Sequence, residues 1–172
     1  MASMRELKGR IGSVNSSQKI TGAMKMISSA KLRKVQSALE HLMPFRNQLQ
    51  NTINNLLGAD SEYQSPLTEQ RPVHRVAFVV FGSDEGLCGA FNVSLFKFLL
   101  EAMNRTNDEL GTKTEYIVYP VGKKILSSVF KMKDVEIADV SYLNSKSGAD
   151  AVKRLTDELT NRFLSHEIDR VE

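Results

Sequence analysis

Apolar residues recur every seven positions through the first 56 residues, a pattern that predicts one long helix with an apolar stripe. The stripe consists of two rows, which lie three or four residues apart and contain Leu7, Val14, Met24, Val35, Ala38, Leu42, Phe45, Leu49 and Leu56. Paired rows of this kind form the seam by which one helix packs against another. At about 1.5 Å per residue such a helix is roughly 80 Å long, so most of it should project from a compact domain.

A projecting helix with a narrow apolar seam needs a partner helix, because helices gain most of their stability from burying such a face. The coiled-coil seam is assigned to five residues of its second half, Val35, Leu42, Phe45, Leu49 and Leu56. Pro44 stands inside this pattern and the seam continues past it, so we expect a bend there and not an end.

The pattern changes after residue 72, where short apolar runs with a strand-like composition alternate with helix-like periods. Strands are predicted over 73–81, 115–121 and about 135–143. The first is followed by the loop 82–92 and then by a helical segment, the second by a helix over 122–131 and the third by a helix over 149–166. Strand and helix in strict alternation predict a parallel sheet with helices on both faces. Another strand should begin at 169–172, so we expect the sheet to be incomplete within this sequence.

The predicted fold class is therefore α/β: a long N-terminal coiled-coil helix plus a partial doubly wound, Rossmann-like parallel sheet. The predicted division is 1–57 for the helix, 58–72 for a connector and 73–172 for the incomplete α/β domain. The connector contains glycine, serine, aspartate and two prolines, which favour turns over regular structure.

Composition excludes several classes of protein. A chain of 172 residues with 41% hydrophobic and 25% charged residues is typical of a soluble globular protein. No stretch reaches the roughly 18 apolar residues that a membrane span requires, and charges near the N-terminus argue against a signal peptide. The single cysteine excludes an internal disulfide and fits a reducing compartment.

The net charge of +3 is divided unevenly along the chain. Residues 1–56 carry nine basic and two acidic side chains, whereas the remaining residues carry 14 basic and 18 acidic ones. The predicted helix is thus a basic rod. A basic coiled coil that binds nucleic acid is one alternative function, but the heptad seam favours a protein partner with acidic groups.

The loop 82–92 follows the first strand, where an open parallel sheet places ligands. Its glycines, Gly82, Gly86 and Gly89, do not have the spacing of a dinucleotide or P-loop motif, and Asp84 and Glu85 place negative charge there. No nucleotide or other cofactor is predicted.

A second alternative is a hydrolase or transferase in which Cys88 is the nucleophile of an elbow-like turn. His166 would be its base, with Glu167 or Asp169 as the orienting carboxylate. The simpler interpretation is a small buried thiol that lets the turn pack. His41 and His74 lack neighbours at ligand spacing, so no metal site is predicted.

Two motifs carry a resemblance to a known family. The segment RELKGRIGSVNSSQKITGAMKMISSAKLRKVQ, residues 5–36, resembles the N-terminal helix of the gamma subunit of F-type rotary ATP synthases, most closely at 18–34. The loop GSDEGLCGAFN, residues 82–92, resembles the second signature of that family, which usually has arginine where Glu85 stands here. Gamma subunits continue through a second long helix that pairs antiparallel with the first, and this sequence does not contain it.

The resemblance implies a non-catalytic rotor shaft that couples ion-driven rotation to conformational change at catalytic sites on other subunits, and that regulates their ATPase activity. It implies that nine residues of the rod face the alpha-beta hexamer: Lys19, Ile20, Thr21, Met24, Lys25, Met26, Lys31, Leu32 and Arg33. It gives the second signature a structural role, in a turn formed by Asp84, Gly86, Leu87, Cys88 and Gly89.

The implied partners are the alpha and beta subunits, the epsilon subunit and the c-subunit ring, with no nucleic acid and only indirect contact with the membrane. The implied location is the cytoplasmic face of a bacterial inner membrane, as a peripheral subunit. No residue is expected to perform catalysis. Because the seam lacks its partner helix, the isolated chain is expected either to self-associate along it or to fray when dilute.

Overall fold

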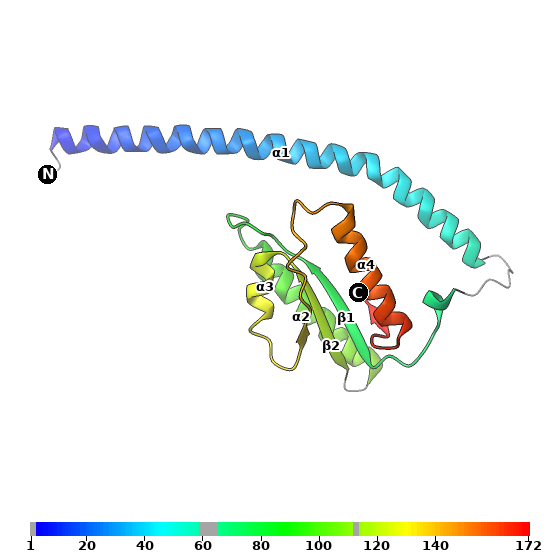
Figure 1. Cartoon of the computed structure of the whole chain (residues 1–172). Coiled ribbons are helices and arrows are strands. Elements are labelled where there is room, and N and C mark those ends of the chain that lie inside the picture. Colours follow the sequence, from blue (N-terminus) through cyan, green and yellow to red (C-terminus); the bar gives the residue numbers. More distant parts are fainter. Residues whose placement is uncertain (1–2, 59–64, 112–113) are drawn as a thin grey trace. The chain divides into compact units, whose positions relative to one another are not determined.

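The computed structural model describes residues 3–58, 65–111 and 114–172 (Figure 1). The chain divides into two compact units, Met1–Tyr63 and Gln64–Glu172. Helix α1 (Met4–Gly58) lies in the first unit. The second unit contains, in chain order, η1 (Pro66–Thr68), β1 (Arg75–Phe81), α2 (Phe91–Leu110), β2 (Glu115–Val121), α3 (Lys123–Val129), β3 (Glu136–Ile137), α4 (Ala149–Leu164) and β4 (Arg170–Val171).

Helix α1 runs without interruption for 55 residues, as the heptad pattern predicts. Its first turn is capped by the hydroxyl of Ser3, which accepts the backbone N–H of Glu6 at 3.3 Å. Pro44 lies inside the helix, which continues past it and curves gently toward its carboxyl end (Figure 1). No residue of α1 is buried.

The second unit is built on a four-stranded parallel sheet with the order β3-β2-β1-β4. β1 pairs with β2 along its whole length, from Arg75 opposite Glu115 to Phe81 opposite Val121. β4 pairs with the other edge of β1, where Val76 lies opposite Arg170. Along the chain, β2 and β3 are added on one side of β1, and β4 is added on its other side after α4. This order confirms the doubly wound α/β prediction.

Alternate residues of the central strands contribute to two separate cores, one on each face of the sheet, because successive side chains of a strand point to opposite faces. On one face Val76 and Phe78 of β1 pack with Leu99 of α2 and Ile125 of α3. On the other face Ala77 packs in a cluster with residues of β2, the segment between β3 and α4, α4 and the turn before β4, namely Ile117, Tyr119, Val121, Val140, Leu143, Leu155 and Ile168. Both faces of the sheet are covered, which explains the nearly continuous apolar runs of β1 and β2.

The strand predicted over 135–143 is wrong in its extent. Strand β3 contains only two residues, because the carboxylate of Asp139 accepts the backbone N–H two residues further on and turns the chain away. Val140 and Leu143 are nevertheless buried, in the core on the α4 side. The residues there are apolar because an irregular segment is buried against the sheet, and not because they form an extended strand.

The other predicted elements are confirmed, the strand over 115–121 with its predicted bounds and the rest with shifted ends. The strand predicted over 73–81 begins at Arg75, the helix predicted over 122–131 spans Lys123–Val129, and the helix predicted over 149–166 ends at Leu164. The last of these ends early because His166 adopts a left-handed backbone conformation, with φ of 61°.

Two glycines allow the carboxyl ends of β1 and β2 to lie very close together. A Cβ atom on Gly122 would lie 2.7 Å from the carbonyl oxygen of Gly82, and Gly122 also has a φ of 117°. A Cβ atom on Gly82 would lie 2.6 Å from the side chain of Ile125. These contacts seat α3 directly on the end of the sheet.

We expect Gly122→Ala to lower the free energy of unfolding of the second unit by roughly 1–3 kcal/mol, because it adds both a clash and a strained backbone. Urea unfolding followed by tyrosine fluorescence measures this. Gly86→Ala in the neighbouring loop is the control, since the nearest atom to its Cβ is 4.0 Å away. Equal stability of the two variants would contradict this account of the turn.

Candidate functional site

The nine rod residues that the sequence assigns to a partner surface all lie on α1 and are all exposed. They span Lys19 to Arg33, about four turns of helix. With about 100° between successive residues, their side chains point around the whole circumference of the helix. They form a collar around the rod, and not a single face.

The basic residues of this collar are spread in the same way. Lys19, Lys25 and Lys31 are six residues apart, so successive lysines point about 120° apart around the helix axis. Lys31 lies seven residues from both Met24 and Ala38 and therefore stands in the apolar row itself. A partner that surrounds the helix meets positive charge from each direction.

The predicted seam is exposed along its length. The exposed fractions are 65% for Val35, 59% for Leu42, 66% for Phe45, 50% for Leu49 and 60% for Leu56. Large apolar side chains gathered along one side of a helix and exposed in this way are candidates for an interaction surface.

The loop 82–92 is organised by two side chains that the sequence analysis did not single out. The amide of Asn92, in the first turn of α2, donates to the hydroxyl of Ser83 at 2.8 Å and to the sulfur of Cys88 at 3.1 Å. Its carbonyl oxygen accepts the backbone N–H of Ser83 at 3.0 Å. Leu87 and Gly89 then adopt left-handed conformations, with φ of 63° and 58°. Ser83 and Asn92 stand near the two ends of the loop that joins the predicted strand to the helix after it, and this placement could have drawn attention to them.

Asp84 fastens this loop to the loop before α4. Its carboxylate accepts the backbone N–H of Ser145 at 2.7 Å. That hydrogen bond is the largest cause that holds the pKa of Asp84 below its ordinary value of 3.8, so the side chain stays ionised. Gly86 and Leu87 extend beyond this anchor, and Leu87 is 97% exposed. The signature turn is therefore a braced loop that presents an apolar tip.

The hypothetical catalytic triad is contradicted by the structure. Cys88 follows the carboxyl end of β1, whereas His166 and Asp169 lie at its amino end, because α4 returns the chain to that edge. His166 contacts Arg71 and Asp169 accepts backbone N–H groups near the start of β1. The expectation that Cys88 is buried is also wrong, since the thiol is exposed.

A hollow of about 710 Å³ lies at the carboxyl ends of β1, β2 and β3. Its wall combines apolar side chains such as Leu126 and Phe130 with the charged groups of Asp84, Asp139 and Lys123. The carboxylates there disfavour a phosphate, in agreement with the absence of a phosphate-binding sequence motif. Within residues 3–58, 65–111 and 114–172, no group of three or more His, Cys, Asp or Glu could hold a metal ion.

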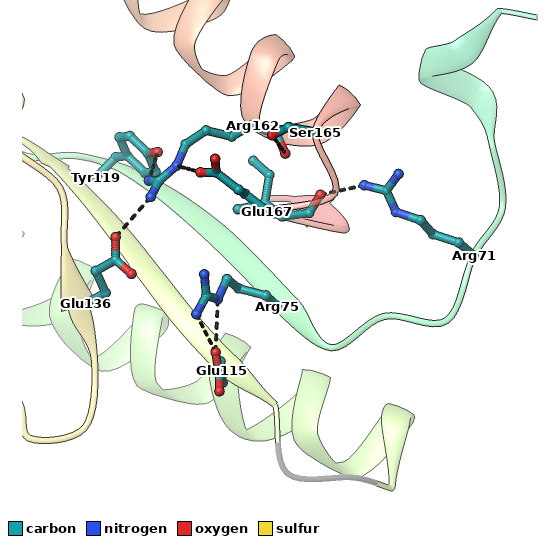
Figure 2. Close-up of polar contacts among 9 residues, drawn as sticks. Arg71, Arg75, Glu115, Tyr119, Glu136, Arg162, Ser165 and Glu167 are labelled. Carbon is teal, nitrogen blue, oxygen red and sulfur yellow. Dashed lines mark hydrogen bonds and ion pairs between the residues drawn. The ribbon is translucent and has the colours of Figure 1, made fainter.

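Two arginines of the second unit, Arg162 and Arg71, each centre a polar network, and Figure 2 shows the bonds of Arg162. Arg162 of α4 donates to the hydroxyl of Tyr119 at 2.7 Å, to Glu167 at 2.9 Å and to Glu136 at 3.0 Å. These bonds, with that to Tyr119 the largest cause, raise the pKa of Arg162 above its ordinary value. Arg162 therefore joins β2, β3 and the turn after α4.

Arg71 centres the second network, together with Asp169. Burial alone would raise the pKa of Asp169, but hydrogen bonds from the backbone of His74 and Arg75 and from Arg71 outweigh it and hold that pKa below 3.8. Arg162 also lines an open hollow of about 510 Å³ on the surface of α4, but its own side-chain bonds are all to groups of the protein. Both networks are structural fastenings of the second unit.

Comparison with known proteins places these features in a family. A family model described as "ATP synthase" matches residues 3–172. Proteins named ATP synthase gamma chain are 41% identical in Phocaeicola vulgatus and 43% identical in Bacteroides fragilis, over 172 residues and 100% of this chain. The protein of that name in Flavobacterium johnsoniae is 37% identical over 176 residues. The chain belongs to the ATP synthase gamma-chain family.

The match covers this chain completely but not its relatives. The chain spans 59% of the length of the Phocaeicola vulgatus and Bacteroides fragilis gamma chains and 58% of the Flavobacterium johnsoniae one. Neither a cysteine hydrolase nor a nucleic-acid-binding coiled coil gains support from these gamma chains. In the described parts of the chain, no helix is both long and apolar enough to cross a bilayer.

The exposed seam predicts that the isolated chain self-associates at micromolar concentration, which analytical ultracentrifugation measures. Leu42→Glu combined with Leu49→Glu should give a monomer, because two charges interrupt the apolar stripe. Asn47→Glu combined with Asn54→Glu has the same spacing on the opposite side of α1 and should leave the association intact. A wild-type chain that sediments as a monomer would rule this surface out as self-complementary.

The lowered pKa of Asp169 predicts a loss of stability in acid. The contribution of Asp169 to the free energy of unfolding is complete at pH values above its ordinary pKa of 3.8, and it disappears as the pH falls through the lower pKa of the folded state. Asp169→Asn should therefore reduce the free energy of unfolding at pH 7 and flatten its decline between about pH 4 and pH 2. Asp134→Asn, at an exposed turn position, is the control. Parallel curves for wild type and Asp169→Asn in urea titrations at several pH values would disprove this linkage.

Proposed function

We propose that this chain serves as the central-stalk rotor subunit of a proton-translocating ATP synthase and regulates its ATPase activity. The observation that carries the proposal is α1, a basic helix of 55 residues in which no residue is buried, in a member of the gamma-chain family. A stiff rod that exposes both an apolar stripe and a collar of cations fits a shaft held inside a ring of other subunits.

The proposed mechanism is mechanical. An asymmetric shaft makes different contacts with each of the three catalytic sites, which lie on other subunits, and turning it changes which site is open. A ligand or partner shifts a conformational equilibrium only by its differential affinity for the two states, so contacts that differ around the shaft are what the mechanism requires. On this proposal the chain itself is not catalytic.

The proposed partners of the rod are the alpha and beta subunits. Cations that point in all directions from Lys19 to Arg33 suit acidic loops around the shaft, because exposed ion pairs are individually weak and are easily exchanged as the shaft turns. The apolar stripe, in contrast, suits a permanent partner helix. The two surfaces thus divide fixed contacts from transient ones.

The proposed position of the second unit is beneath the hexamer, against the epsilon subunit and the c-subunit ring. Leu87, at the tip of the signature turn, and Phe81 give it exposed apolar contacts. The complex would lie at the cytoplasmic face of a bacterial inner membrane, with this chain as a peripheral subunit that meets the bilayer only through its partners.

Removing cations from the collar tests this proposal. We expect Lys25→Gln, Lys31→Gln and Arg33→Gln together to weaken binding to the alpha-beta hexamer on the order of tenfold, because each exposed ion pair contributes up to about 1 kcal/mol. The loss should shrink at high salt. Surface plasmon resonance with immobilised hexamer measures both effects.

The control removes the same charge from the second unit, through Lys97→Gln, Lys131→Gln and Lys133→Gln, all of which are exposed. These changes should leave hexamer binding unchanged. If the two triple variants lose affinity equally, the collar is not the hexamer-facing surface.

A further inference from the structure

The side chain of Arg71 fastens the segment of the second unit that leads into β1. The chain reaches β1 through residues 65–74, in which the turn η1 is followed by Arg71. The side chain of Arg71 is only 11% exposed, which is unusual for an arginine outside a regular element. Any pull that passes along the chain between α1 and β1 must pass through this segment.

The guanidinium of Arg71 reaches the turn between α4 and β4 (Figure 2). Its Nη2 donates to the carbonyl oxygens of Phe163 at 2.8 Å and Ile168 at 2.6 Å, and its Nε donates to Asp169 at 2.9 Å. Its Nη1 lies 2.7 Å from Nδ1 of His166. The planar group also lies over the ring of Phe163, 4.2 Å from its centre. All three nitrogens are engaged with one short stretch of chain.

Asp169 closes this arrangement into a ring. One of its carboxylate oxygens accepts Arg71, and the other accepts the backbone N–H groups of His74 at 2.9 Å and Arg75 at 3.0 Å. The backbone N–H of Asp169 in turn donates to the carbonyl oxygen of Arg75 at 2.8 Å. The entering segment is therefore bonded to the α4–β4 turn both before β1 and at its first residue.

The turn that receives Arg71 is itself held firmly. The backbone N–H groups of Glu167 and Ile168 both donate to the carbonyl oxygen of Arg162, and Ile168 is fully buried. Arg162 is anchored through its side chain to Tyr119 of β2. A pull on Arg71 is thus shared among α4, β4 and β2, whereas without Arg71 it would fall first on the bonds from the backbone of His74 and Arg75 to Asp169.

We propose that Arg71 is the positioning residue that transmits torque between the rod and the sheet unit, a role that rests on the proposed rotor function. Hydrogen bonds that share a force in parallel resist it better than bonds that break one after another. The task needs the fork of a guanidinium, because a lysine ammonium is a single point that cannot reach two carbonyls and a carboxylate in fixed geometry.

We call the bonds that join Arg71, Asp169 and the start of β1 the clasp, and hydrogen exchange on the full chain tests whether it exists. In Arg71→Gln, the amides of His74, Arg75, Asp169 and Glu172 should exchange about tenfold faster or more, because several charge-assisted hydrogen bonds are lost. Arg75→Gln is the matched control, since Arg75 lies four residues away and its side chain pairs across the strand with Glu115. Unchanged exchange in Arg71→Gln would overturn the clasp.

Coupling in the assembled synthase tests whether the clasp carries torque. Vesicles that hold the complex are assayed for ATP hydrolysis and for ATP-driven proton pumping, with the amount of bound chain measured in parallel. We expect Arg71→Gln to lower protons pumped per ATP at least about twofold at unchanged content of the chain, and Arg71→Lys to fail to restore it. Arg75→Gln should match wild type.

The outcomes separate the two proposals. If complexes with the wild-type chain hydrolyse ATP without pumping, the rotor function fails, and this inference fails with it. If wild type pumps and Arg71→Gln pumps equally well per ATP, only the torque role of Arg71 fails. If Arg71→Gln does not assemble, Arg71→Lys decides: normal coupling in that variant overturns the role, and reduced coupling supports it.

Discussion

The apolar stripe of α1 is the constraint on which the architecture depends. A helix of 55 residues in which no residue is buried has little tertiary stabilisation of its own, since most helical stability comes from packing an apolar face. On the proposed function, the seam takes a partner helix, while the rest of the circumference is left for weaker contacts. The cations of the collar occupy that circumference, and Lys31 even interrupts the apolar row.

The second unit, in contrast, has its contacts within itself. Its parallel sheet is buried on both faces, Gly82 and Gly122 lie in close contact at the carboxyl ends of β1 and β2, Arg162 joins α4 to β2 and β3, and Arg71 is bonded to the turn before β4. The charged networks lie at the ends of strands, where irregular backbone needs donors and acceptors, and not in the cores. A rod that depends on partners is thus joined to a unit that is internally braced.

The sequence predicted the elements that follow from periodicity and missed the features that depend on long-range contacts. The heptad rows gave α1, and the alternation of apolar runs gave a parallel sheet whose second strand has the expected bounds, 115–121. The failed part of the strand at 135–143 is apolar because it covers the sheet, a role that local pattern does not distinguish from a strand. Arg71 and Asn92 looked like ordinary polar residues, because their partners lie 92 to 98 and four to nine positions away. The collar and the seam remain predictions, since they concern partners.

The most direct test of the central claim is to watch this chain turn. Cys88 is the one cysteine of the sequence and its thiol is exposed, so a visible probe can be attached to it in a complex whose hexamer is fixed to a surface. On addition of ATP, the account predicts stepwise rotation of the probe in one direction, at a rate that follows ATP hydrolysis. A probe that stays still or only fluctuates while the same complexes hydrolyse ATP would contradict a rotor function.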